Sequence, residues 1–211
     1  MTRLQNPDNQ GGLQLTSATL AAFTKYPRES WVGGNTHAGV SAKKQGFTVA
    51  DRENFETVAN EVGLIRRDSP YAMWCRHPLA FLVEAADDIS YRVIDLEDGY
   101  RLGHFSYEEV VDAFLDLLPD RDKQSDRLKA IREKKDRVEF LRAKVINQII
   151  LQARDCFLDN ETEILDGSFD QPLLEMIPCR QKADHLIDLA VERIYCAPEV
   201  VSIQAAGFQV V

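Results

Sequence analysis

The chain has 211 residues, 45% of them hydrophobic and 28% charged, which is ordinary for a globular protein long enough to bury a core. Its net charge of −9, from 34 acidic and 25 basic residues, argues against a general nucleic-acid-binding surface, because such a surface needs a basic footprint. A local basic pocket for a polyanion stays compatible with this charge, since net charge does not describe individual sites.

Cysteine usage and hydropathy favour a soluble, cytoplasmic protein. The cysteines show neither CxxC spacing nor a histidine at a zinc-ligand interval, so we expect buried, reduced thiols at Cys75, Cys156, Cys179 and Cys196. The polar start MTRLQNPDNQ does not read as a signal peptide. No apolar run approaches the roughly 20 residues that cross a bilayer, so we expect no membrane partner.

The first part of the chain alternates connectors with short helices. Residues 1–12 read as a polar connector, and an apolar stripe predicts a helix from near Thr16 that must end before Pro27. Residues 28–45 are rich in glycine, serine, asparagine and lysine and predict a long loop, which in compact domains is usually functional or disordered. A further amphipathic helix is predicted over 51–63, with Gly63 as its left-handed terminator.

Three longer helices are predicted next. The central one begins at Pro78, a residue suited to a first helical turn, and extends to about Asp98-Gly99. The next begins with the capping box Ser106-Tyr107-Glu108-Glu109 and stops at Pro119. The most convincing helical spacing, over 138–158, follows a densely charged segment that we interpret as a solvated face.

The last part of the chain predicts a helix over 182–195, followed by a segment, VVSIQAAGFQVV, that could be a strand or a helix cut short. No other segment shows a sustained alternation of apolar and polar residues, and no internal repeat is present. The sequence therefore predicts an all-α fold, a helical bundle.

Acidic residues interrupt the apolar run of the central helix. Asp87 and Asp88 lie inside this run, where burying an unpaired carboxylate costs several kcal/mol, so a cation or polar ligand would explain them. Asp87, Tyr91 and Asp95 are spaced i, i+4, i+8 and project from one helix face. We interpret this stripe as one wall of a site for a polar ligand with a metal attached.

The run RHPLAFLVEAADDISYRVIDLEDG resembles the bacterial deoxynucleoside triphosphate triphosphohydrolases, the dGTPase branch of the HD-domain metal phosphohydrolases. The segments LTSATLAAFTKYPR, KKQGF and AKVINQIILQARDCFLDNETEIL resemble the same family, in the same order. The resemblance implies the fold of the C-terminal portion of an HD-domain phosphohydrolase. It also implies that 1–120 belong to the catalytic core and that 121–211 form a C-terminal helical region.

The His and His-Asp motifs that name the HD superfamily lie upstream in family members, and this chain contains no His-Asp dipeptide. MTRLQ resembles the middle of a family sequence, and AGFQVV resembles a truncated end. We therefore expect an internal or C-terminal piece of the enzyme that is inactive alone, because two histidines and one aspartate of the metal site are missing.

The family reaction hydrolyses a dNTP, with dGTP expected here, to a deoxynucleoside and triphosphate. By resemblance, Asp87 is a ligand of a divalent metal (Mn2+, Mg2+ or Fe2+), while Tyr91 and Asp95 hold the deoxyribose and its 3′-hydroxyl. By resemblance also, Lys25, Tyr26 and Lys44 lie near the triphosphate, although Lys43 could replace Lys44 in this register.

Each assignment has a simpler alternative. Asp87 could cap or salt-bridge within the bundle, Tyr91 could belong to the core with Asp95 a surface acid, and the lysines could be solvated. Arg76 and His77 fit a helix N-terminal turn better than a ligand contact. No P-loop, Gly-x-Gly-x-x-Gly, Ser-His-Asp or Cys-His arrangement offers another chemistry.

Two other functions stay open. The chain could be a non-catalytic helical assembly module, since related enzymes form multimers and the helix over 138–158 carries apolar surface. It could also be another HD-type nucleotide phosphohydrolase, such as a guanosine tetraphosphate hydrolase. The resemblance further implies a homo-oligomer joined through helical surfaces, and allows single-stranded DNA as an effector.

Overall fold

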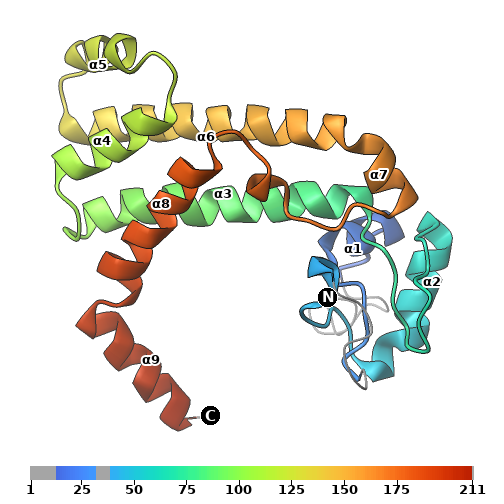
Figure 1. Ribbon diagram of the computed structural model, residues 1–211. Coiled ribbons are helices and arrows are strands. Elements are labelled where there is room, and N and C mark those ends of the chain that lie inside the picture. Colours follow the sequence, from blue (N-terminus) through green and yellow to red (C-terminus); the bar gives the residue numbers. More distant parts are fainter. Residues whose placement is uncertain (1–12, 32–38, 211) are drawn as a thin grey trace. The chain divides into compact units, whose positions relative to one another are not determined.

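The computed structural model describes residues 13–31 and 39–210, so the predicted connector over 1–12 and part of the predicted loop over 28–45 lie outside it. The described residues are helical apart from turns and three isolated bridges, as Figure 1 shows, which confirms the all-α prediction. Two compact units are present: unit 1 comprises 1–85 and 157–173, and unit 2 comprises 86–156 and 174–211. The predicted division into 1–120 and 121–211 stays a prediction.

Unit 1 contains two short helices that pack against each other, α1 (Ser17–Phe23) and α2 (Arg52–Val62). The Thr16 side chain caps α1 by accepting a hydrogen bond from the amide of Thr19 at 3.2 Å. Gly63 ends α2 with φ 70°, the left-handed conformation that its sequence position predicted. Aromatic stacking holds the core beside α2, where Phe55 lies between Phe47 and Trp74.

The remaining elements of unit 1 are short turns and the ends of long helices. They are the 3-10 turns η1 (Val40–Ala42) and η2 (Val49–Asp51), the first residues of α3 (Pro78–Arg101), the last of α6 (Lys134–Asp159), and α7 (Glu161–Asp166). A buried carboxylate, Glu29, joins its own segment to the start of α2 and to the segment before α3: it accepts hydrogen bonds from the Arg52 guanidinium at 2.5 and 2.8 Å and from the Ala72 amide at 2.9 Å.

Unit 2 is built from most of α3 and α6, which run antiparallel (Figure 1), together with α4 (Tyr107–Leu117), α5 (Arg121–Lys129) and α8 (Arg180–Ala190). The buried carboxylate of Glu97 on α3 accepts hydrogen bonds from Arg142 on α6 at 2.6 Å and from Arg101 at 2.8 Å. The capping box predicted at Ser106 is present, with Glu109 as its other member, and α4 ends before Pro119.

Three predicted boundaries differ from the structure. The central helix extends to Arg101, because Gly99 is buried inside α3 rather than ending it. The predicted helix over 182–195 is two elements, α8 and a π-helical turn, η4 (Val191–Tyr195). The ambiguous terminal segment is helical, as α9 (Pro198–Val210).

The side chains follow the predicted burial only in part. Phe23, the last residue of the apolar helix α1 that was predicted to begin near Thr16, is 57% exposed. Of the four predicted buried thiols, Cys196 is exposed. All four cysteines are reduced thiols. Within the described ranges, every helix is too short or too polar to cross a membrane.

Candidate functional site

The predicted phosphate-binding residues come together in unit 1. The Tyr26 ring has the Lys25 ammonium at 5.8 Å from its centre, the Lys44 ammonium at 6.0 Å and the Arg76 guanidinium at 5.9 Å. We call Lys25, Lys44 and Arg76 around Tyr26 the cationic cluster. Three cations within about 6 Å of the centre of one ring make an electropositive site, because the ring quadrupole attracts cations without neutralising them.

A glycine explains why Lys44 reaches Tyr26. A Cβ atom on Gly46 would lie 2.1 Å from the carbonyl oxygen of Tyr26 and 2.7 Å from the Thr24 side chain, so the backbone approaches too closely for any other residue. The Gly46 amide donates to the Arg28 carbonyl at 3.0 Å, which holds the two segments together. The motif KKQGF therefore lies directly against KYPR.

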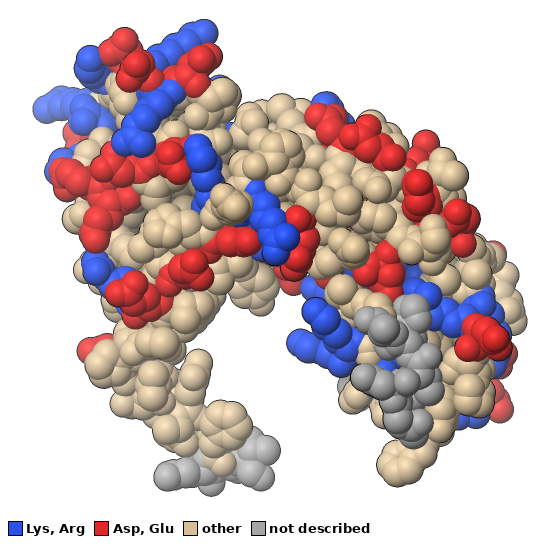
Figure 2. Space-filling model, viewed as in Figure 1, with Lys and Arg blue, Asp and Glu red and all other residues tan. Residues whose placement is uncertain are grey.

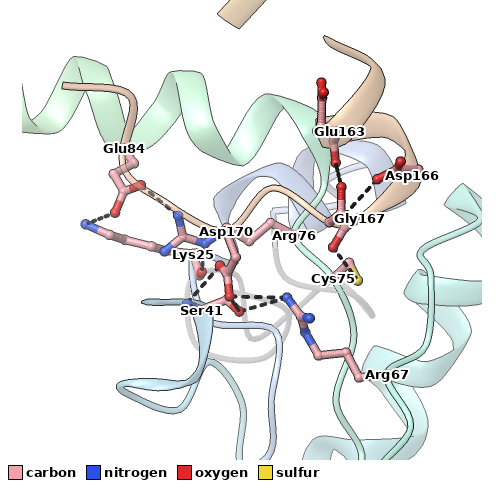
Figure 3. Close-up of polar contacts among 11 residues, drawn as sticks. Lys25, Ser41, Arg67, Cys75, Arg76, Glu84, Glu163, Asp166, Gly167 and Asp170 are labelled. Atoms are coloured by element: carbon pink, nitrogen blue, oxygen red, sulfur yellow. Dashed lines mark hydrogen bonds and ion pairs between the residues drawn. The ribbon is translucent and has the colours of Figure 1, made fainter. Parts of the chain in front are cut away.

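A buried carboxylate fixes the other side of the cluster. Glu84, on the first turns of α3, accepts a hydrogen bond from Arg76 at 2.7 Å and pairs with Lys25 at 3.1 Å, as Figure 3 shows. The Arg76 Nε also donates to the Lys25 carbonyl at 2.9 Å. One carboxylate thus orders two cations of the cluster.

Arg76 is buried, and its Nη2 atom makes no hydrogen bond to any described residue. A buried guanidinium donor without an acceptor is uncommon in folded proteins and indicates a position where a ligand or water can accept. His77, beside it, accepts a hydrogen bond from the Leu79 amide at 3.1 Å, and burial lowers the pKa of its imidazole. This fits the predicted N-terminal turn for His77, whereas Arg76 does more than cap the helix.

A pocket adjoins the cluster. Its volume of about 710 Å³ is in the range of small-molecule sites. Lys25, Tyr26, Gly46, Phe47 and Phe55 all form part of its wall. Figure 2 shows lysine and arginine side chains gathered on the visible face of unit 1, although the whole chain is acidic. The pocket therefore offers aromatic walls next to concentrated positive charge.

The other predicted residues lie on α3 in unit 2, and we call Asp87, Tyr91 and Asp95 the α3 stripe. Asp87 is exposed and Tyr91 is 57% exposed, so Tyr91 is not a core residue. Asp88 is half-buried and lies 3.8 Å from Arg92. The expectation that Asp87 and Asp88 are buried, unpaired carboxylates is therefore wrong, because α3 turns Asp87 to the surface and gives Asp88 a cation at i+4.

Asp95, unlike the other two members of the stripe, is hydrogen-bonded to the side chain of another described residue. Its carboxylate accepts a hydrogen bond from the hydroxyl of Tyr195, which lies in the π-helical turn η4. Burial and the Asp95 carboxylate raise the pKa of Tyr195 to about 12. Sequence reasoning did not identify Tyr195, Glu84 or Gly46; only Glu84, an acid inside an apolar run, and Gly46, inside a quoted motif, left a signal in the sequence.

A metal would have one candidate ligand in the stripe. The exposed Asp87 carboxylate is a suitable oxygen ligand for a divalent cation. Among the described residues, however, no three histidine, cysteine, aspartate or glutamate side chains converge on a common point. One carboxylate does not hold an ion by itself, so the described residues do not make up a complete metal site.

Comparison with known proteins supports the resemblance noted in the sequence. No family model matches the chain. A deoxyguanosinetriphosphate triphosphohydrolase-like protein of Synechocystis is 41% identical over 213 residues, covering 100% of this chain and 47% of the relative. A similarly named protein of Pseudomonas aeruginosa is 32% identical, covering 92% of this chain and 44% of its own length. A deoxyguanosinetriphosphate triphosphohydrolase of Klebsiella pneumoniae is 29% identical, covering 94% of this chain and 42% of its own length. The predicted resemblance is confirmed, and the chain spans about half the length of these relatives.

Proposed function

Because the chain resembles the deoxyguanosinetriphosphate triphosphohydrolases along its whole length, we propose that it carries the phosphate- and sugar-binding part of a dNTP triphosphohydrolase. The observation that carries the proposal is the cationic cluster around Tyr26, with the unsatisfied Nη2 donor of Arg76 beside it. Clustered cations with spare donors are the chemistry that recognises a polyphosphate.

The proposed reaction joins water to a dNTP at the α-phosphorus. The oxygen of water forms a bond to that phosphorus, the bond to the 5′-oxygen breaks, and the 5′-oxygen takes a proton, giving deoxynucleoside and inorganic triphosphate. Lys25, Tyr26 and Lys44 would bind the triphosphate and offset the charge that develops on its oxygens. Arg76 would add a donor from the buried side.

In the α3 stripe, Tyr91 and Asp95 would hydrogen-bond the deoxyribose hydroxyl, and Asp87 would be one ligand of a divalent cation, Mn2+, Mg2+ or Fe2+. Such an ion, when bound, supplies Lewis acidity toward phosphoryl oxygen and water. Since the described residues offer Asp87 no companion ligands, we expect the 211-residue chain alone to release no triphosphate.

The decisive experiment compares triphosphate release from dGTP, with Mn2+, by the chain alone and by the chain extended upstream to include the His and His-Asp motifs. We expect activity only in the extended protein. Asp87→Ala should lower it about a hundredfold or more, because a metal ligand is lost. Asp98→Ala, which removes an exposed carboxylate from the same helix, is the matched control and should leave it unchanged. An extended protein inactive on every dNTP would refute the proposal.

A second candidate, a helical assembly module, is favoured by exposed apolar side chains. Ile150 and Leu158 on α6 are 49% and 56% exposed, and Ile203 and Phe208 on α9 are 74% and 86% exposed. Homo-oligomer formation through these helices is compatible with both functions. Hydrolysis of a dNTP by the extended protein separates them, and a preference for deoxy over ribo substrates separates a dNTPase from a guanosine tetraphosphate hydrolase.

A cytoplasmic location is part of the proposal, because four reduced thiols fit a reducing compartment. Single-stranded DNA remains a proposed effector, and the net charge of −9 limits it to a local basic patch. Gel filtration and light scattering with and without a short oligonucleotide would test both the oligomer and this effector.

A further inference from the structure

Tyr195 reaches Asp95 across 100 positions of the sequence. Its hydroxyl donates to Oδ2 of the carboxylate, while Oδ1 makes no hydrogen bond to any described residue. Asp95 is half-buried and Tyr195 is 38% exposed, so the pair lies at the surface of unit 2 with one side accessible. The α3 stripe therefore presents one carboxylate oxygen that is already bound and one that is available.

The backbone that carries Tyr195 is unusual. It is a π-helical turn, η4, between α8 and Cys196, and such turns are rare and occur frequently at functional sites. Gly99 on α3 makes room for this turn, because a Cβ atom there would lie 2.8 Å from Ile194 and 2.6 Å from the Phe105 ring. The absent side chain lets Ile194 pack on the helix one turn beyond Asp95.

A second contact holds η4 from the other side. Arg193 donates to Glu109 at 2.9 Å, and its guanidinium lies 5.6 Å from the centre of the Phe105 ring. Glu109 is itself fixed as a member of the α4 capping box. Each of three consecutive residues therefore has its own contact: Arg193 with α4, Ile194 with α3 at Gly99, and Tyr195 with Asp95. Together these contacts leave the Tyr195 hydroxyl little freedom to move.

The protonation state of Tyr195 suits a donor. Burial, the hydrogen bond to Asp95 and the nearby Tyr91 raise the pKa of Tyr195 to about 12, so at neutral pH the hydroxyl keeps its proton. The phenol can therefore only donate to the carboxylate and does not compete with it as a base.

We infer that Tyr195 is a positioning residue for Asp95: its hydroxyl holds Oδ2 so that Oδ1 points at a hydroxyl group of the substrate sugar. The inference rests on the proposed function, in which Asp95 binds the 3′-hydroxyl. A carboxylate held by a second donor loses less rotamer freedom on binding, and it rejects an analogue without the hydroxyl more strongly. Tyr195 would therefore contribute to the choice of sugar without touching the reacting phosphate.

The test measures kcat/KM for dGTP and for 2′,3′-dideoxyguanosine triphosphate, using the extended protein with Mn2+. Tyr195→Phe removes only the hydroxyl and should lower kcat/KM for dGTP roughly tenfold while leaving the dideoxy analogue almost unchanged. Tyr107→Phe on α4 is the matched control and should change neither value. It also removes a single phenol hydroxyl, one that accepts a hydrogen bond from the Arg137 guanidinium at 3.5 Å. In an Asp95→Asn background, Tyr195→Phe should have no further effect.

Each other outcome has one meaning. Equal losses on both substrates would show that Tyr195 only supports the fold, and an unchanged preference for dGTP would show that it does not position Asp95; either result overturns the inference and leaves the proposed function standing. Absence of dNTP hydrolysis in the unsubstituted extended protein would instead overturn the proposed function, and the role of Tyr195 with it.

Discussion

The cationic cluster of unit 1 and the α3 stripe of unit 2 hold their polar groups in different ways. In the cluster, Arg76 and Glu84 are both buried and joined at 2.7 Å, and Gly46 locks a second segment against Tyr26. In the stripe, Asp87 and Tyr91 are exposed, and the Asp95 carboxylate is held by the Tyr195 hydroxyl. A buried network costs stability when any member is removed, whereas an exposed stripe can be altered with little effect on folding.

Within our proposal, this difference fits the different ligands of the two regions. A triphosphate is a large, fixed charge that favours a preorganised, rigid receptor. A metal ligand and a sugar contact need an open face, because the rest of their coordination comes from other groups.

Glu84→Gln should be the most destabilising change. It leaves Arg76 buried beside a neutral amide, and breaking a buried ion pair from one side costs about 3–5 kcal/mol. We expect that loss in the free energy of urea unfolding. Asp126→Asn, which breaks the exposed pair with Lys129, is the control and should cost less than about 1 kcal/mol. A loss from Glu84→Gln no larger than the control would mean that the cluster is not held by this pair.

Glycine substitutions compare the close approaches in the two units. Gly46→Ala places a methyl group 2.1 Å from a backbone oxygen, which cannot move without separating the two segments, so we expect a loss of about 2–3 kcal/mol. The new methyl group of Gly99→Ala would meet the side chains of Phe105 and Ile194, which can shift, and alanine has the higher helix propensity. We therefore expect a smaller loss of stability, about 1 kcal/mol. Gly207→Ala meets nothing within 4 Å and is the control. Thermal unfolding measures all three, and the reverse order for Gly46 and Gly99 would contradict the contrast.

Lys44→Ala should weaken binding of inorganic triphosphate to the 211-residue chain about fivefold, because one of the ammonium groups near Tyr26 is lost. Lys43→Ala is the matched control, since it removes the same charge one position earlier in the same exposed segment. Isothermal titration calorimetry at low salt gives both dissociation constants. A larger effect from Lys43 would assign the phosphate contact to that residue instead.

The pH dependence of stability should depend on Tyr195. Its pKa in the folded state, about 12, exceeds the ordinary tyrosine value of 10.0, so the folded state retains the proton more strongly. This contribution is complete below pH 10 and is lost as the pH rises from 10 to about 12. The free energy of unfolding of the native chain should therefore fall more steeply in this window than that of Tyr195→Phe. Denaturant unfolding at several pH values measures the slopes, and identical slopes would show that the hydrogen bond to Asp95 does not form.

Much of the candidate site was visible in the sequence, because its members belong to short motifs. Lys25, Tyr26 and Lys44 come from KYPR and KKQGF, and the structure brings them together. Whether they bind a phosphate, and whether Asp87 binds a metal, stay predictions. Exposure of Asp87 was not predicted, because the apolar run around it suggests burial on both faces of the helix.

By itself, the sequence determined most of the helices, the start of α1 near Thr16, the cap at Ser106, the left-handed end at Gly63 and the resemblance to one enzyme family. These features depend on residues three or four positions apart or on contiguous motifs. Only the tertiary structure decided that Glu84 orders two cations, that Gly46 and Gly99 are sites of close approach, and that Tyr195 meets Asp95. These contacts join residues 6 to 100 positions apart, and no local pattern encodes which partner a side chain will find once the helices have packed.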